Sequence, residues 1–136
     1  LNKLEYFTHI RKAIAKKYNE SFEEIDEIIT PFQLANTESS WHLYVVQLNL
    51  DKLNITRKEI FNELHHNNIG VQIHYIPVYY YPYYQQLGYK KGLCPNAEAL
   101  YERIITIPLY PKMKDDDVKL VIDILKNIIE KHRGIP

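Results

Sequence analysis

The sequence is poor in several features that define particular classes of protein. Its 136 residues include one cysteine, Cys94, so no disulfide can form within the chain, which favours a reducing environment. No apolar run approaches the length of a membrane span, and the first residues lack the pattern of a signal peptide. Because 17 basic and 17 acidic side chains cancel, nucleic acid and membrane surfaces are poor partners. We expect a soluble, cytoplasmic protein.

Complete metal-binding and catalytic motifs are also missing from the sequence. His42 and His74 fall in or beside predicted strands, but two histidines without a cysteine or carboxylate at ligand spacing do not form a zinc site. His65 and His66 are adjacent on a predicted helix and diverge by about 100°, so they cannot share an ion. Cys94 has no histidine near it in sequence to activate its thiol. We expect no metal site and no catalytic residue in this chain.

What is present is enough apolar sequence for one core. With 136 residues and 46% hydrophobic residues, the chain predicts a single domain that spans residues 1–136. The chain begins at Leu1 rather than at methionine and enters a helical pattern at once. This abrupt start suggests a piece of a longer polypeptide.

Four helices are predicted from periodicity and from their end signals. Apolar positions recur every three or four residues over 2–19, which indicates an amphipathic helix. A capping box at 56–59 starts a second helix, and the Asn and Gly residues of 67–70 end it. Proline in the first turn favours a helix over 95–103. The last helix starts near Asp115, where acidic residues suit the positive end of the helix dipole.

Three strands are predicted between these helices. The segment 41–50 is rich in β-branched and aromatic residues and apolar on both faces, so we expect a central strand. Residues 71–75 and 104–107 predict two more, each followed by a proline. Residues 21–40 indicate only a turn and a polar loop. The predicted fold class is α/β (α+β), two-layer, with a small three- to four-stranded sheet packed with helices.

The stretch from Gly70 to Tyr84 is the strongest candidate for a binding site. A predicted strand delivers His74 and Tyr75 to its end, Pro77 stops it, and a tyrosine-rich loop follows. Phenols combine a flat apolar face with a hydrogen-bonding tip, which suits sugar rings, nucleobases or a protein interface. Any single tyrosine could equally pad the loop against the core. For the loop as a whole, we favour recognition.

Four short segments resemble the C-terminal part of the DegT/DnrJ/StrS sugar aminotransferases. In order they are Ser-Trp-His-Leu-Tyr at 40–44, Gly-Val-Gln-Ile-His-Tyr-Ile-Pro-Val at 70–78, Cys-Pro-Asn-Ala-Glu at 94–98 and Ile-Pro-Leu-Tyr-Pro at 107–111. The opening helix is also similar to the helix that enters the family's small domain, so the resemblance spans essentially the whole chain. Within the family, the segments that contain His42 and His74 are most similar to enzymes of the pseudaminic acid pathway. Those enzymes aminate a UDP-linked 4-keto-6-deoxy sugar, with pyridoxal phosphate (PLP) as cofactor and glutamate as amino donor.

The resemblance implies that this chain is the C-terminal small domain of a fold-type I PLP enzyme that works as a homodimer. The lysine, aspartate and phosphate-binding residues that hold PLP in the family belong to its large domain. The chain alone would then be inactive and would hold no catalytic or cofactor-binding residue. The resemblance makes His74 and Tyr75 the best candidates for contacting the UDP-sugar, followed by Tyr79, Tyr83 and Tyr84.

Two other functions remain open at this point. One is a stand-alone, non-catalytic module that binds a sugar or a nucleotide through the tyrosine loop. The other is a dimerisation module that uses the apolar stripe of the first helix.

Overall fold

The computed structural model describes residues 3–134 of the chain. The elements follow the order α1 (Leu4–Phe22), β1 (Ile28–Ile29), β2 (Tyr44–Leu48), the 3₁₀ turn η1 (Leu50–Lys52), α2 (Arg57–His66), the 3₁₀ turn η2 (Val78–Tyr80), α3 (Pro82–Gln86), α4 (Pro95–Tyr101), β3 (Ile104–Ile107) and α5 (Asp115–Lys131). The predicted helix start at residue 2 lies outside the described residues. No helix between residues 3 and 134 is long and apolar enough to cross a bilayer.

The sheet has three antiparallel strands in the order β1-β2-β3. Tyr44 lies opposite Ile107 and Gln47 opposite Ile104, while Ile28 pairs with Leu48. The predicted central strand is therefore confirmed, because β2 has a partner on each side. It is shorter than the predicted 41–50, since Trp41 has a φ of 49°, which is incompatible with extended backbone.

The expected strand over 71–75 is wrong. Only Gln72 pairs with β3, exchanging backbone hydrogen bonds of 3.1 and 2.7 Å with Thr106. In this antiparallel register the next bonded pair would place Gly70 opposite Pro108, which has no N–H to donate. On the other side of the bridge, the His74 ring bonds the Thr106 side chain instead of continuing the ladder. The chain therefore touches the sheet edge at one point and then leaves it.

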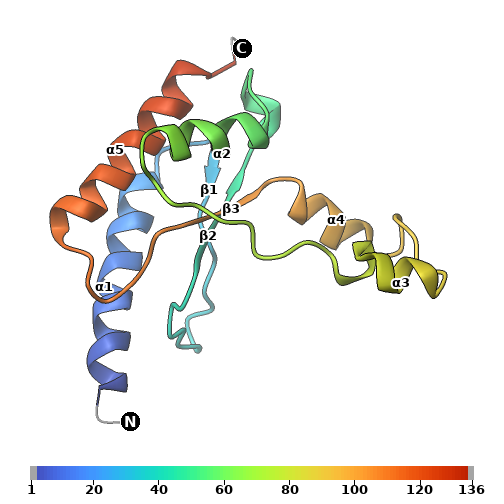
Figure 1. The fold of residues 1–136 in the computed structure, drawn as a ribbon. Coiled ribbons are helices and arrows are strands. Elements are labelled where there is room, and N and C mark those ends of the chain that lie inside the picture. Colours follow the sequence, from blue (N-terminus) through green and yellow to red (C-terminus); the bar gives the residue numbers. More distant parts are fainter. Residues whose placement is uncertain (1–2, 135–136) are drawn as a thin grey trace.

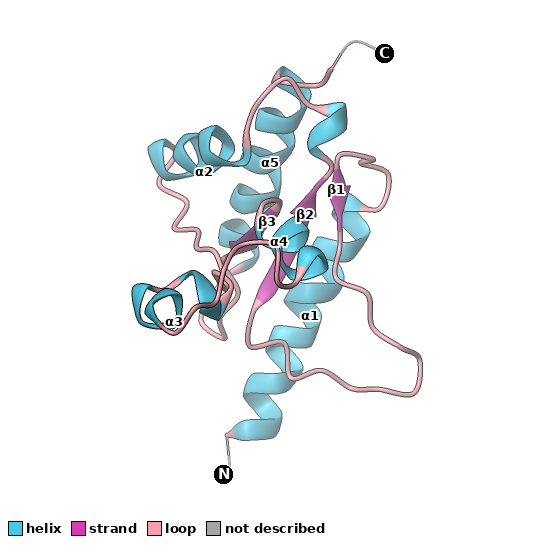
Figure 2. Cartoon of the chain, turned by 90° about the vertical axis from the view of Figure 1, so that its right-hand side faces the viewer, coloured by secondary structure: helices cyan, strands magenta, loops and turns pink. Residues whose placement is uncertain are grey.

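Helices α1, α2 and α5 cover one face of the sheet, as Figures 1 and 2 show from two directions. Along β2 the side chains alternate between buried and half-buried, as period two requires. The buried side faces α1, where the Tyr18 and Tyr44 rings lie 4.9 Å apart. The fully buried side chains of this core include Tyr18, Phe22, Tyr44, Val46, Leu48, Leu64, Leu125 and Ile129. The opposite face is only partly covered, with Val45 and Gln47 half-buried.

The helix boundaries follow local signals closely where capping chemistry sets them. At α2 the predicted capping box is present: the Glu59 amide donates to Thr56 Oγ1 at 3.3 Å, and the Thr56 amide donates to Glu59 Oε2 at 2.9 Å. Asn68, with a φ of 60°, supplies the left-handed residue after the helix. α1 runs to Phe22, beyond the predicted end at residue 19, because Phe22 is buried in the core. α4 ends at Tyr101 rather than at 103.

The part of the chain from η2 through α4 forms an arm that projects from the body (Figure 1). We define the arm as residues 78–101, from the start of η2 to the end of α4. Every residue from 81 to 97 is exposed. The sequence predicted a loop for most of this region, but it contains the short helix α3, which begins at Pro82. Pro82 fixes a helical φ at the first helical position, where its missing N–H has no partner to lose.

Candidate functional site

The candidate site lies where the chain leaves the sheet edge for the arm. His74 Nδ1 lies 2.9 Å from the hydroxyl of Thr106 on β3, and the histidine is half-buried. The Tyr75 ring packs edge-on against the imidazole, with centroids 4.6 Å apart and planes at 76°. Tyr75 itself is 70% exposed. The sheet thus fixes His74, His74 supports Tyr75, and the phenol of Tyr75 is accessible to a ligand.

Tyr79 occupies a different environment, inside the arm, where its side chain meets α4. Its hydroxyl donates to Glu98 Oε1 at 2.7 Å, and the same carboxylate oxygen accepts the Gly92 amide at 2.6 Å. Partial burial, together with the negative charge of Glu98, raises the pKa of Tyr79. Burial alone would raise the pKa of Glu98, but the bonds from Tyr79 and Gly92 lower it below its usual value. The hydroxyl of Tyr79 is therefore engaged by a partner within the arm.

Tyr83 and Tyr84 lie on α3, in the outer part of the arm. They are 65% and 36% exposed, and their rings pack edge-on with centroids 5.3 Å apart. Tyr84 also packs edge-on against Tyr89, at 6.2 Å. The five predicted residues thus divide into the pair His74–Tyr75 at the sheet edge, Tyr79 bonded to α4 within the arm, and the pair Tyr83–Tyr84 on α3. His42 precedes β2 and is exposed.

Sequence reasoning missed two residues that support this region, Glu98 and Thr106. Glu98 is only 8% exposed, and Thr106 is 6% exposed in a strand otherwise made of isoleucine. A carboxylate on the buried side of a short helix and a lone hydroxyl in an apolar strand both need polar partners. The lone threonine of Ile-Ile-Thr-Ile was visible in the sequence, but the burial of Glu98 and the partners Tyr79 and His74 were not.

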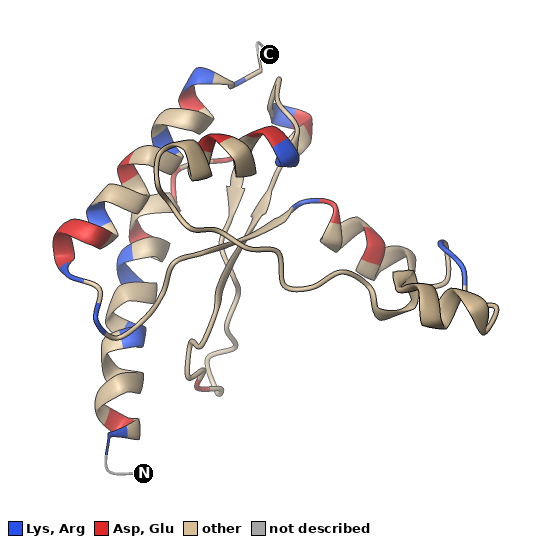
Figure 3. Ribbon diagram, viewed as in Figure 1, with Lys and Arg blue, Asp and Glu red and all other residues tan. Residues whose placement is uncertain are grey.

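The arm is mostly uncharged along α3 (Figure 3). Lys90 and Lys91 follow that helix, and the Lys91 ammonium lies 6.0 Å from the centre of the Tyr80 ring. At the arm root, the guanidinium of Arg57 stacks 5.1 Å from the centre of the Tyr101 ring, which connects α4 to the start of α2. The outer surface of the arm is therefore aromatic and neutral, with its positive charge after α3.

Two surface hollows of about 520 and 510 Å³ lie away from these residues. The first surrounds the start of α2 and includes Leu53 and Arg57, and the second lies between α1 and β1. Neither hollow is lined by a predicted site residue. Tyr75, with 70% of its surface exposed, stands on an open surface, and an enclosed ligand site there needs a second wall.

The lysines between residues 3 and 134 do not fit a PLP site. Every one of them is exposed or half-buried. Several pair with carboxylates, as in Lys17–Asp115 at 2.7 Å and Lys119–Asp123 at 2.7 Å. The carboxylate of Asp123 raises the pKa of Lys119, whereas a Schiff-base lysine needs a lowered one. In the same range, no group of three His, Cys, Asp or Glu residues could hold a metal ion.

The match to known sequences identifies the family. Residues 1–126 match the DegT/DnrJ/EryC1/StrS aminotransferase family. Because the match covers most of the chain, the chain belongs to this family, and the resemblance drawn from four short segments is confirmed.

Curated relatives match almost the whole of this chain. MJ1066 of Methanocaldococcus jannaschii is 45% identical over 98% of this chain and 35% of its own length. The spore coat polysaccharide biosynthesis protein SpsC of Bacillus subtilis is 42% identical over 96% of this chain and 34% of its own. A Campylobacter jejuni UDP-4-amino-4,6-dideoxy-N-acetyl-beta-L-altrosamine transaminase is 34% identical over the same shares. The chain thus spans about a third of the length of these relatives.

Solved structures agree with this assignment. The PLP form of the Streptococcus pneumoniae protein Spr1654 superposes with a TM-score of 0.87 at 30% identity, over 96% of this chain and 33% of the other. PseC of Helicobacter pylori, an aminotransferase involved in the biosynthesis of pseudaminic acid, gives 0.87 at 27% identity, over 96% and 35%. The expected sheet packed with helices is confirmed as the fold of one part of such aminotransferases.

Proposed function

We propose that this chain is the C-terminal small domain of a PLP-dependent nucleotide-sugar aminotransferase. The full enzyme transfers an amino group from glutamate to a UDP-linked 4-keto-6-deoxy sugar and acts in the biosynthesis of a surface polysaccharide or glycan of the pseudaminic acid type. The observation that carries the proposal is the supported, open His74–Tyr75 pair, in a chain that spans a third of its relatives. The names of SpsC and of the Campylobacter transaminase support the sugar substrate.

Within this enzyme, the chain closes one wall of the substrate cleft. The Tyr75 hydroxyl can exchange a hydrogen bond with a sugar hydroxyl or a phosphate oxygen, and its ring face can cover the apolar side of a sugar ring. The bond of His74 to Thr106 limits its rotation, so less entropy is lost when a ligand contacts the pair. Tyr79, Tyr83 and Tyr84 are secondary contacts in this proposal.

The chemical step belongs to the part of the enzyme that holds PLP, where the bound cofactor supplies an electron sink. The contribution of this chain is binding and orientation, together with the exclusion of water from its side of the cleft. We further propose that the full enzyme is a homodimer, as in the family resemblance.

A stand-alone binding module is the second candidate, favoured by the exposed tyrosines of α3. The two functions differ in what the isolated chain does. Tight binding of a UDP-sugar by the isolated chain, measured by calorimetry, would favour the module. Weak or absent binding fits a cleft with one wall missing.

The proposal is tested by Tyr75→Phe in the full-length enzyme. This substitution removes the hydroxyl and with it one hydrogen bond, which contributes about 0.5–1.5 kcal/mol. We therefore expect the KM for the UDP-sugar to rise roughly two- to tenfold. The visible absorbance of the PLP cofactor should not change, because Tyr75 is not proposed to touch it. Tyr6→Phe on α1, which alters another exposed phenol, is the matched control. An unchanged dependence on the UDP-sugar would remove Tyr75 from the site.

A further inference from the structure

The outer arm exposes many large apolar side chains within a short stretch of the chain. Its large apolar side chains are at least 36% exposed at seven positions between residues 78 and 93. These are Val78, Tyr81, Tyr83, Tyr84, Leu87, Tyr89 and Leu93. Tyr84 packs against both Tyr83 and Tyr89, so at least these three rings lie side by side. Large exposed apolar patches mark interaction sites.

This surface is held in shape even though it projects away from the core. Glu98 joins the two sides of the arm by accepting from Tyr79 and from the Gly92 amide. Gly88 and Gly92 have φ values of 92° and 94°, a region that favours glycine, and they turn the chain between α3 and α4. A surface shaped before it meets a partner loses less entropy on binding.

The body offers little support to this part of the arm. The contact of Arg57 with Tyr101 lies at the root, next to the body, and α3 projects beyond it (Figure 1). Because every residue from 81 to 97 is exposed, the body does not cover this part of the arm.

We propose that the outer arm, residues 78–94, is the surface on which this domain docks against the rest of its own polypeptide. This inference rests on the proposed function, in which the chain is one part of a longer protein. In MJ1066, SpsC and PseC, about two thirds of the polypeptide lies outside the part that this chain matches. A covalently linked partner acts at a high effective concentration, so it outcompetes a separate molecule. The neutral, aromatic character of α3 fits an apolar partner surface, not a charged one.

The experiment places a photo-crosslinking amino acid, benzoylphenylalanine, at Leu87 in the full-length protein. Leu120 on α5 is the matched control, because it is also leucine and is 52% exposed against 61% for Leu87. We expect cross-linking from position 87, several-fold above position 120, within the mass of one polypeptide and onto residues outside 1–136. Cross-links at twice that mass would show that a second copy covers the arm and would overturn the proposal. Cross-linking no greater than at position 120, or a reading frame without a further domain, would also overturn it.

A second readout does not depend on the cross-linker. Leu87→Asp in the full-length protein should expose the peptide bonds after Lys90 and Lys91 to trypsin, raising cleavage there at least several-fold, while Leu120→Asp should not. Equal cleavage in the two variants would contradict docking. A transaminase assay on the same protein separates the two proposals. A protein that shows the cross-link but no transaminase activity would contradict the proposed function. An active protein whose arm is cleaved by trypsin without any substitution would contradict the docking.

Discussion

Two leucines of α5 show that the position of a residue within one helix decides how much it contributes to stability. Leu125 is fully buried against the sheet layer, while Leu120, five residues earlier, is 52% exposed. The 100° turn per residue places them on different faces of the helix. The same side chain therefore stabilises the core at one position and serves as solvent-exposed surface at the other.

We expect Leu125→Ala to lower the free energy of unfolding by about 2–5 kcal/mol, because it removes buried methyl groups and leaves a cavity. Leu120→Ala should change it by no more than about 0.5 kcal/mol. Urea denaturation of both variants, followed by circular dichroism, measures the difference. Similar values for the two variants would contradict the burial pattern of α5.

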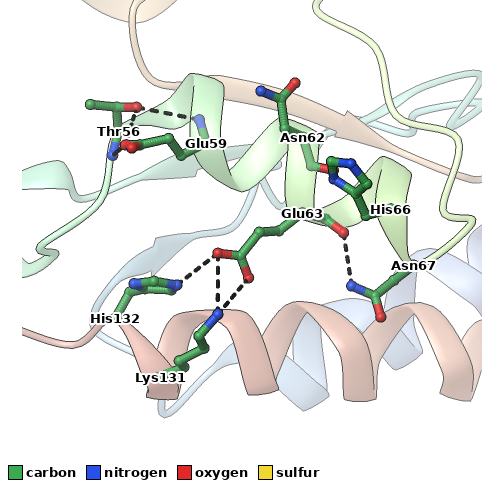
Figure 4. A network of polar contacts seen from close by, with 8 residues as sticks. All are labelled: Thr56, Glu59, Asn62, Glu63, His66, Asn67, Lys131 and His132. Carbon is green, nitrogen blue, oxygen red and sulfur yellow. Dashed lines mark hydrogen bonds and ion pairs between the residues drawn. The ribbon is translucent and has the colours of Figure 1, made fainter.

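At the scale of elements, ion pairs and hydrogen bonds of one carboxylate join α2 to the end of α5 (Figure 4). Glu63 on α2 lies between His132 Nε2, at 2.8 Å from Oε1, and Lys131 Nζ, at 3.3 Å from Oε2. Both partners sit at the C-terminal end of α5, where positive charge also suits the helix dipole. Glu63 thus ties together two helices that local sequence signals predict separately.

This junction predicts a specific acid sensitivity. Burial would raise the pKa of Glu63, but the hydrogen bonds from His132 and Lys131 outweigh it and hold the pKa below the usual value of about 4.3. A depressed folded-state pKa stabilises the fold above the unfolded-state pKa, and that stabilisation is lost as the pH falls through the folded-state pKa. Glu63→Gln should therefore flatten the loss of stability below about pH 4.3.

Urea titrations at several pH values measure how steeply stability falls with pH. Glu24→Gln, which changes an exposed carboxylate after α1, is the control. Equal slopes in the two variants would contradict the role of Glu63.

At the scale of the whole molecule, the chain has a body with one core and an arm with its own internal contacts. The body buries the apolar faces of β2, α1, α2 and α5. The arm depends instead on Glu98, on edge-on tyrosine pairs and on tight backbone turns. Regions with few buried apolar contacts open more easily than the core that carries them.

We expect Glu98→Ala to loosen the arm without destabilising the body. It removes the charged acceptor of Tyr79 and Gly92, and loss of hydrogen bonds to a charged group costs about 1.5–3 kcal/mol. Amide hydrogen exchange in α3 and α4 should rise about tenfold or more, while exchange in β2 and α5 stays unchanged. Glu102→Ala, an exposed carboxylate just after α4, is the control. Equal acceleration in the body would show that the arm and the core unfold together.

Several features were predictable from the sequence because their causes are local. The capping box at Thr56, the strand Ile104–Ile107 ended by Pro108, and the acidic start of α5 each depend on residues within one or two turns. Hydrophobic periodicity gave the helices that cover the sheet, and four short segments gave the family.

The remaining features depend on contacts between distant residues. The segment 71–75 has strand composition but forms a single bridge, because Pro108, far along the chain, cannot extend the ladder. β1 is two residues long and exists only because β2 pairs with it. Tyr79 and Glu98 are nineteen residues apart, and their bond could not be read from the sequence. The sequence by itself determined the helices, the central strand and the family, through local propensity and periodicity. Only the tertiary structure decided which tyrosines face solvent, because burial and hydrogen-bond partners depend on the packing of the whole chain.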